Sequence, residues 1–139
     1  MRLSKTVALT LVVMLLGSAV AFAQGDEGDK LAQIAKVPPA ERAKVQTMVM
    51  TEKLGLTPQQ SPAVAEINLR TANLMQPVLT GSDGPLIRMR KVKGIEEQRD
   101  ASLEKVLLPP QYQQWLAEKE AVRQKVEAKL TEKRQGGGN

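Results

Sequence analysis

The chain has 139 residues, with 20 Lys and Arg against 15 Asp and Glu, a formal net charge of +5, and neither Cys nor His. The lack of Cys excludes disulfides, thiol nucleophiles and zinc–thiolate sites. The lack of His removes the most common general base and transition-metal ligand. The length suits one domain. Together with the absence of any phosphate-binding glycine loop, the composition argues against an enzyme and predicts no cofactor.

Residues 1–23 have the pattern of a cleaved secretory signal peptide. Two basic residues precede an apolar stretch over residues 7–16, and Ala21 and Ala23 place small side chains at positions −3 and −1 of a cleavage site. The apolar stretch is shorter than the about 20 residues that cross a bilayer. We therefore expect an exported protein that begins at Gln24 and has no membrane anchor.

The expected mature chain must build its core almost without aromatic rings. Cleavage removes two basic residues, so the net charge falls from +5 to +3, and Tyr112 and Trp115 remain as the only aromatic residues. Aromatic rings usually supply large blocks of buried area, and no strand-type alternation is present. We expect an all-α fold in which about four antiparallel amphipathic helices form a thin hairpin or cradle. Because such a layer buries a limited fraction of its surface, we also expect a homodimer.

The first helix is predicted over residues 40–54, after a flexible N-terminal segment over residues 24–39 that ends in two prolines. A short helical turn fits within that segment, around residues 31–37. Helical spacing places Val45, Met48 and Val49 on the buried face of the first helix. Gly55 follows as the residue that ends this helix in a left-handed conformation.

The most informative local sequence is Leu56-Thr57-Pro58-Gln59-Gln60. Thr57 reads as an N-cap, Pro58 as the first helical residue and Gln60 as the third, which together form a capping box. Leu56 is placed to pack back on the apolar face. Pro62 allows a second interpretation, in which Ser61 caps a helix that restarts at Pro62. The sequence leaves both helix starts open.

Three further helices follow, separated by a Gly- and Pro-containing loop at residues 81–85 and by a second proline corner. The second helix is predicted to end near residue 79, the third to cover residues 86–107, and the fourth to run from residue 109 or 110 to residue 131. Their apolar stripes comprise Val64, Ile67, Thr71, Leu74, Met75 and Val78; Met89, Val92, Ile95, Leu103, Val106 and Leu107; and Tyr112, Trp115, Lys119, Val122, Val126 and Leu130. Residues 40–131 thus form the helical domain, and residues 132–139 are expected to be a disordered polar tail.

The corner motif returns in weaker form at Leu107-Leu108-Pro109-Pro110-Gln111. The two copies share Leu-x-Pro-x-Gln and are 51 positions apart. Leu108 replaces the capping threonine and has no oxygen to accept a hydrogen bond. The trios Leu56, Pro58, Gln60 and Leu107, Pro109, Gln111, with Thr57, are therefore interpreted as structural caps.

Those two corners, the signal-peptide pattern and the helical chain between them resemble the LTXXQ-motif family of periplasmic proteins, the Spy/CpxP-like group. The resemblance covers roughly residues 40–130. It implies an antiparallel helical hairpin, often a cradle-shaped dimer, located in the periplasm. It also implies ATP-independent chaperoning of unfolded or misfolded envelope proteins, or accessory regulation by docking on an envelope stress sensor. Metal-sensing relatives in this group use His, which this chain lacks.

A basic segment with interleaved apolar residues is the candidate client-binding site. It comprises Arg88, Met89, Arg90, Lys91, Val92 and Lys93. Charge would attract a client over distance, and Met adapts to varied sequences. The alternative is a solvated helix face whose Met89 and Val92 belong to the core. Export, the modest mature charge and the scarcity of aromatic residues argue against nucleic acid as a partner.

Three other groups of residues each allow two interpretations. Glu96, Asp100 and Glu104 are spaced to present carboxylates to a hard cation, but neighbouring basic residues favour a salt-bridged surface. Tyr112 and Trp115 are packing anchors or, alternatively, part of a client groove. Four methionines either mark an adaptable surface or fill the core: Met48, Met50, Met75 and Met89.

Overall fold

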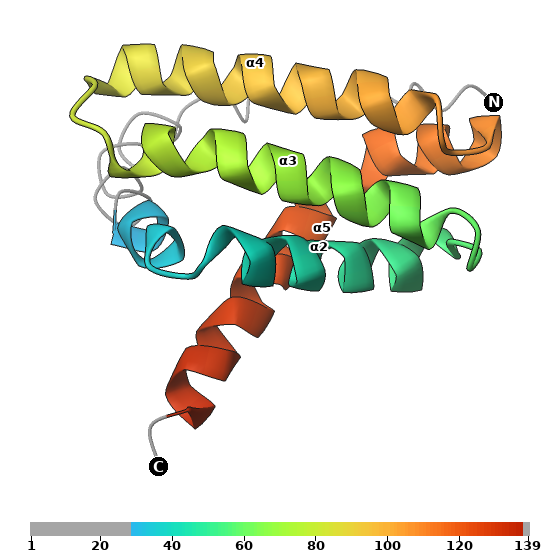
Figure 1. Ribbon diagram of the computed structural model, residues 1–139, viewed down its shortest axis with the longest axis horizontal. Helices are drawn as coiled ribbons and strands as arrows, with labels where there is room; N and C mark the ends of the chain where they lie inside the picture. Colours follow the sequence, from blue (N-terminus) through green and yellow to red (C-terminus); the bar gives the residue numbers. More distant parts are fainter. Residues whose placement is uncertain (1–28, 138–139) are drawn as a thin grey trace, which may run out of the picture.

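The computed structural model describes residues 29–137, and within this range the chain is helical almost throughout and contains no strand. A short helical segment covers residues 29–35. Four longer helices follow: α2 (Pro39–Leu54), α3 (Ser61–Thr80), α4 (Pro85–Glu104) and α5 (Pro109–Gly136) (Figure 1). The prediction of an all-α fold is confirmed.

Proline and glycine define the ends of these helices. Each of the four longer helices has a proline at its first or second position, where the missing N–H costs no helical hydrogen bond. Gly55 ends α2 with φ 62° and ψ 47°, and its N–H donates to the Thr51 carbonyl at 3.0 Å. This is the left-handed C-terminal cap that the sequence predicted.

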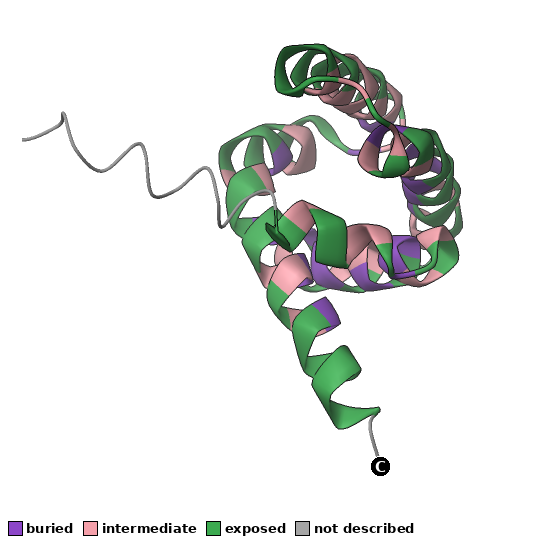
Figure 2. Ribbon diagram, turned by 90° about the vertical axis from the view of Figure 1, so that its left-hand side faces the viewer, coloured by how far each residue is buried: buried purple, intermediate pink, exposed green. Residues whose placement is uncertain are grey.

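The helices follow a curve instead of stacking in two flat layers. Helix α2 lies between α3 and α5, α3 also packs against α4, and α4 and α5 touch only slightly. Figure 2 shows this curved arrangement end-on, and Figure 1 shows the C-terminal part of α5 extending beyond the other helices. Helices α4 and α5 are consecutive in the chain, yet their main connection is the corner that joins them.

The core is built mainly by α2, α3 and α5. The largest fully buried side chains are Trp115, Met50, Leu103, Val45, Val49, Val64 and Val122. The prediction for α2 is wrong at Met48, which is 48% exposed, whereas Met50 is completely buried. Since α2 is covered on two sides, by α3 and by α5, its buried surface is wider than the single apolar stripe read from the sequence.

Helix α4 differs most from its predicted form. It ends at Glu104, so Val106 and Leu107 belong to the corner that follows. Only Leu103 is buried along the whole helix, and Met89 of the predicted apolar stripe is 62% exposed. The reason is that α4 packs along α3 over most of its length, and no other helix described within residues 29–137 covers its N-terminal half (Figure 2).

Both ends of the described chain are more ordered than the sequence suggested. Helix α5 continues to Gly136, so a disordered tail over residues 132–139 is wrong for residues 132–136. Lys133 pairs there with Glu41 of α2, which holds the last turns against the rest of the molecule. Part of the segment expected to be flexible, residues 24–39, is helical at residues 29–35. The predicted signal peptide, residues 24–28 and residues 138–139 lie outside the described residues.

Candidate functional site

The two Leu-x-Pro-x-Gln corners lie side by side and bind each other through their glutamines. Gln60 Nε2 donates to Gln111 Oε1 at 2.7 Å, and Gln111 Nε2 donates to Gln60 Oε1 at 3.1 Å. Gln60 also donates to the Val106 carbonyl at 3.3 Å, and Gln111 donates to the Gly55 carbonyl at 3.5 Å. Val106 and Gly55 occupy equivalent positions in the two copies. The corners therefore make reciprocal contacts, which the repeat spacing alone did not reveal.

The capping box predicted at the first corner is present. The Thr57 N–H donates to Gln60 Oε1 at 3.1 Å, and the Gln60 N–H donates to Thr57 Oγ1 at 3.2 Å. These bonds close a single turn over residues 57–60, and α3 itself begins at Ser61 with Pro62 at its second position. Neither helix start that the sequence left open is matched, because Thr57 caps only this turn and α3 begins at Ser61 with Gln60, and not Ser61, at its N-cap position.

The second corner keeps half of this arrangement. The Leu108 N–H donates to Gln111 Oε1 at 2.9 Å, but Leu108 supplies no side-chain acceptor in return. Leu56 and Leu107, the first residues of the two motifs, are 8% and 6% exposed and belong to the core. The motif residues are occupied in holding the two corners together, which leaves ligand binding to other parts of the molecule.

The basic segment of α4 divides into residues that hold a loop and residues that face solvent. Arg88 Nη2 donates to the carbonyls of Gly81 and Asp83 at 3.1 and 3.4 Å. Lys91 pairs with the Asp83 carboxylate at 2.5 Å. Two of the four cations proposed for client binding therefore hold the connection between α3 and α4.

The remaining basic side chains lie beside an exposed apolar cluster. Arg90 is exposed, and Lys93 lies 3.9 Å from a carboxylate oxygen of Glu97 with three-quarters of its side chain accessible. Leu86, Ile87 and Met89 are 57%, 50% and 62% exposed. We call these five residues the α4 surface: Leu86, Ile87, Met89, Arg90 and Lys93. Leu86 was predicted to lie in a helix, but the sequence pattern did not indicate that Leu86 and Ile87 extend the exposed cluster.

The carboxylates of α4 are engaged with basic and aromatic side chains. Asp100 accepts hydrogen bonds from Trp115 Nε1 at 2.9 Å and from Lys119 Nζ at 2.8 Å. The Arg99 guanidinium lies 5.0 Å from the centre of the Trp115 ring, and Glu96 lies 4.0 Å from Arg99. Within residues 29–137, no cluster of three or more His, Cys, Asp or Glu side chains is arranged to hold a metal ion. The geometry here is that of a salt-bridged network.

Both aromatic side chains pack into the core. Trp115 is fully buried, and Tyr112 is half-buried against the same core cluster. Burial raises the pKa of the Tyr112 phenol, and the nearby carboxylates of Glu104 and Asp100 raise it further. This packing supports the interpretation of the two rings as anchors and not as part of a client groove.

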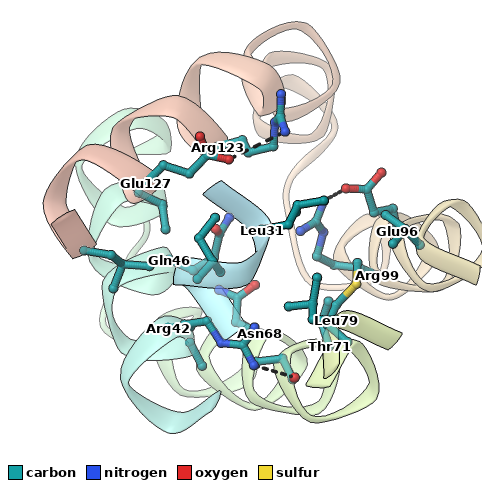
Figure 3. A pocket seen from close by; sticks show the side chains of 17 residues that line it. Leu31, Arg42, Gln46, Asn68, Thr71, Leu79, Glu96, Arg99, Arg123 and Glu127 are labelled. Atoms are coloured by element: carbon teal, nitrogen blue, oxygen red, sulfur yellow. Dashed lines mark hydrogen bonds and ion pairs between the residues drawn. The ribbon is translucent and has the colours of Figure 1, made fainter. Parts of the chain in front are cut away.

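A cavity of about 190 Å³ lies at the centre of the curved arrangement, with walls from all four long helices and from residues 29–35 (Figure 3). Its polar side chains come from different helices: Arg42 from α2, Asn68 from α3, Glu96 and Arg99 from α4. Val92 of the basic segment lines this cavity and does not share the exposure of Met89. No local sequence pattern indicated this site, because its walls come from segments far apart in the chain.

Three buried polar atoms with no hydrogen-bond partner belong to residues that line this cavity. They are Arg42 Nε, Asn68 Oδ1 and Arg99 Nε. Burial lowers the pKa of the Arg99 guanidinium, an effect that Glu96 and Asp100 partly offset. Buried polar groups in native proteins are nearly always paired, so the cavity is the most distinctive polar feature inside the molecule.

None of the helices described between residues 29 and 137 has the length and apolar character needed to cross a bilayer.

Residues 23–115 match a protein family described as a domain of unknown function, DUF4890. The chain belongs to this family. The DUF4890 match covers α2, α3 and α4, both Leu-x-Pro-x-Gln corners and the start of α5. It ends at Trp115, the buried ring that joins α5 to Asp100 of α4. No curated protein and no solved structure matches the chain.

Proposed function

We propose that this DUF4890 protein is an ATP-independent, chaperone-like protein of the periplasm that binds unfolded or misfolded envelope proteins through the α4 surface. The signal-peptide pattern supports the location, and the resemblance of the paired corners to the Spy/CpxP-like group supports the activity. No nucleotide or cofactor takes part in the proposed function.

The observation that carries this proposal is the exposure of α4. This 20-residue helix has one buried residue, and three large apolar side chains within its first five positions are at least half exposed. Clustered apolar exposure usually marks an interaction surface. Met89 adds a side chain that adapts to different partners, and Arg90 and Lys93 add positive charge that attracts acidic segments.

Suppression of aggregation tests the proposal directly. Purified residues 24–139 should suppress light scattering by a chemically unfolded client in the absence of ATP. The effect should weaken at high salt, because the flanking cations act over a distance that salt shortens. No suppression at several-fold molar excess over the client would refute the proposal.

Matched variants locate the activity on α4. Replacing Leu86, Ile87 and Met89 together by Ser should remove most of the suppression while leaving the helical content and Tm nearly unchanged, since these side chains are exposed. Leu116→Ser on α5 is the control, because Leu116 is also an exposed leucine, at 39%, but lies outside the α4 surface. Equal loss in the control would show that the α4 surface is not the binding site.

The same surface also fits the proposed homodimer and the alternative role as an accessory regulator. Light scattering at tens of micromolar should give a dimer mass, and the triple Ser variant of the α4 surface should shift it toward monomer. Crosslinking in the native envelope separates the two roles. Many weakly captured clients support chaperoning, whereas one stoichiometric sensor protein would replace that proposal with regulatory docking.

A further inference from the structure

Arg42 is a buried charge without a counter-ion among the described residues. Arg42 is 7% exposed. Its Nη2 donates to two neutral groups, the Ala72 carbonyl at 3.3 Å and the Gln76 side-chain oxygen. No carboxylate in residues 29–137 lies within ion-pair distance of Arg42, which is absent from every salt bridge there. Its Nε has no partner. Buried charges are normally paired, because desolvation otherwise penalises the charged form.

The surroundings of Arg42 are those of a ligand site. Arg42 lines the cavity of about 190 Å³, whose walls are largely aliphatic: Leu31, Ile34, Met75, Leu79, Val126 and Leu130. Asn68 is 3% exposed, and its Oδ1, which also lacks a partner, belongs to the same lining. Figure 3 shows Arg42 and Asn68 reaching the cavity from α2 and α3. A cationic group, an unsatisfied acceptor and an apolar wall thus meet at one place.

The balance of charge in the lining indicates a ligand with one negative charge. Among the described residues, three cationic side chains line the cavity, Arg42, Arg99 and Arg123, together with two carboxylates, Glu96 and Glu127. Arg123 is paired with Glu127 at 3.5 Å, and Arg99 lies 4.0 Å from Glu96. Arg42 is the cation left over, and the two carboxylates would repel a doubly charged group such as phosphate.

We propose that the Arg42 cavity binds an aliphatic carboxylate, with the carboxylate at Arg42 and the chain along the aliphatic wall. Asn68 Oδ1 is an acceptor and cannot pair with the carboxylate itself, so a water molecule that enters with the ligand would donate to it. An apolar cavity of about 150 Å³ accepts benzene, so this one takes a chain of about six to eight carbons. Such a group comes either from a free fatty acid or from the C-terminal aliphatic residue of a polypeptide. The site is distinct from the α4 surface, and the proposal does not depend on client binding there.

Calorimetric titration of residues 24–139 with octanoate, octanol and two peptides tests this assignment. The peptides end in Leu, one as the free acid and the other as the amide. Octanoate should bind at least tenfold more tightly than octanol, which has the same chain without the charge. Binding of octanoate alone identifies a free fatty acid as the source, and binding of the free-acid peptide but not the amide identifies a polypeptide terminus. Failure of both carboxylates to bind, or equal binding of octanoate and octanol, would overturn the proposal.

Arg42→Met removes the charge and leaves an unbranched apolar side chain in its place. It should abolish the preference for octanoate over octanol, whereas Arg70→Met, at an exposed arginine of α3 that does not line the cavity, should leave it intact. Val92→Phe gives a second measurement if the Arg42 variant does not fold. It should fill part of the cavity from α4 and weaken octanoate at least tenfold, with Arg42 unchanged. Full octanoate binding by either the Arg42 or the Val92 variant would show that the ligand lies elsewhere.

Discussion

The pairing of Gln60 with Gln111 gives the sharpest test of how the two corners hold the fold. Gln111→Ala removes both hydrogen bonds of the amide pair, the bond to the Leu108 N–H at 2.9 Å, and longer bonds to the Leu54 and Gly55 carbonyls. Each net hydrogen bond stabilises a protein by about 1 kcal/mol. Both glutamines are half-buried, so water replaces part of what is lost, and we expect a cost of about 2–3 kcal/mol.

A double-mutant cycle isolates the direct pair. Gln60→Ala should cost a similar amount, about 2 kcal/mol, because it also removes half of the first capping box. The double variant should cost about 1 kcal/mol less than the sum of the single variants, since the amide pair can be lost only once. Urea unfolding followed by far-UV circular dichroism measures these free energies. The control is Gln113→Ala, an exposed glutamine on the same helix, which should change the free energy of unfolding by less than about 0.5 kcal/mol. A coupling energy near zero, or an equal cost in the control, would refute the reasoning.

The remaining predictions each change one residue and test one local interaction. Leu108→Thr should raise the free energy of unfolding by about 1 kcal/mol in urea titrations, because it supplies the missing acceptor at a 60%-exposed, extended N-cap. Gly94→Ala should raise Tm, since a Cβ there meets nothing within 4 Å and the alanine stabilises helix α4 by about 1 kcal/mol. Gly55→Ala should lower Tm by a similar amount, because φ at this position is 62°. Lys133 lowers the pKa of the exposed Glu41 carboxyl by a hydrogen bond and by its charge, so NMR titration of Lys133→Met should show the pKa of Glu41 rising toward its usual value. The stabilisation from that pair should be present at neutral pH and be lost as the pH falls through the lowered pKa of Glu41.

The sequence predicted the parts of the fold that depend on local chemistry. The start of α5 at Pro109, the left-handed Gly55 and the capping box at Thr57 all follow from interactions within four residues. The stripe of α5 was also correct at Trp115 and Val122, which are both fully buried, because a single face of that helix meets the core.

The errors occur where burial depends on which helices become neighbours. Met89 was placed on an apolar stripe, yet none of the other described helices covers that part of α4. Met50 was left open between the surface and the core, and it is buried because α2 is covered from two sides. The last turns of α5 are helical where a tail was expected, since Lys133 finds a partner 92 positions away. Such contacts leave no trace in local periodicity.

The cavity left only a weak signal in the sequence. Arg42 precedes Val45 by three residues and Val49 by seven, so it lies on the buried stripe of α2. A basic residue on such a stripe indicates a paired or functional charge. The spacing could place Arg42 inside, but it could not show that the opposing helices bring no carboxylate to it.

Helix α4 contributes to both proposed sites, but through different faces. Val92, Glu96 and Arg99 line the cavity at helical spacing, whereas Leu86, Arg90 and Lys93 are turned away from it. A carboxylate bound at the cavity adds contacts to the inner face of a helix that otherwise packs mainly along α3, so octanoate should slow hydrogen exchange across the middle of α4. It should leave client binding at the outer face in place. Competition between octanoate and an unfolded client, with no change in exchange, would instead mean that clients enter the cavity and that the two faces form one site.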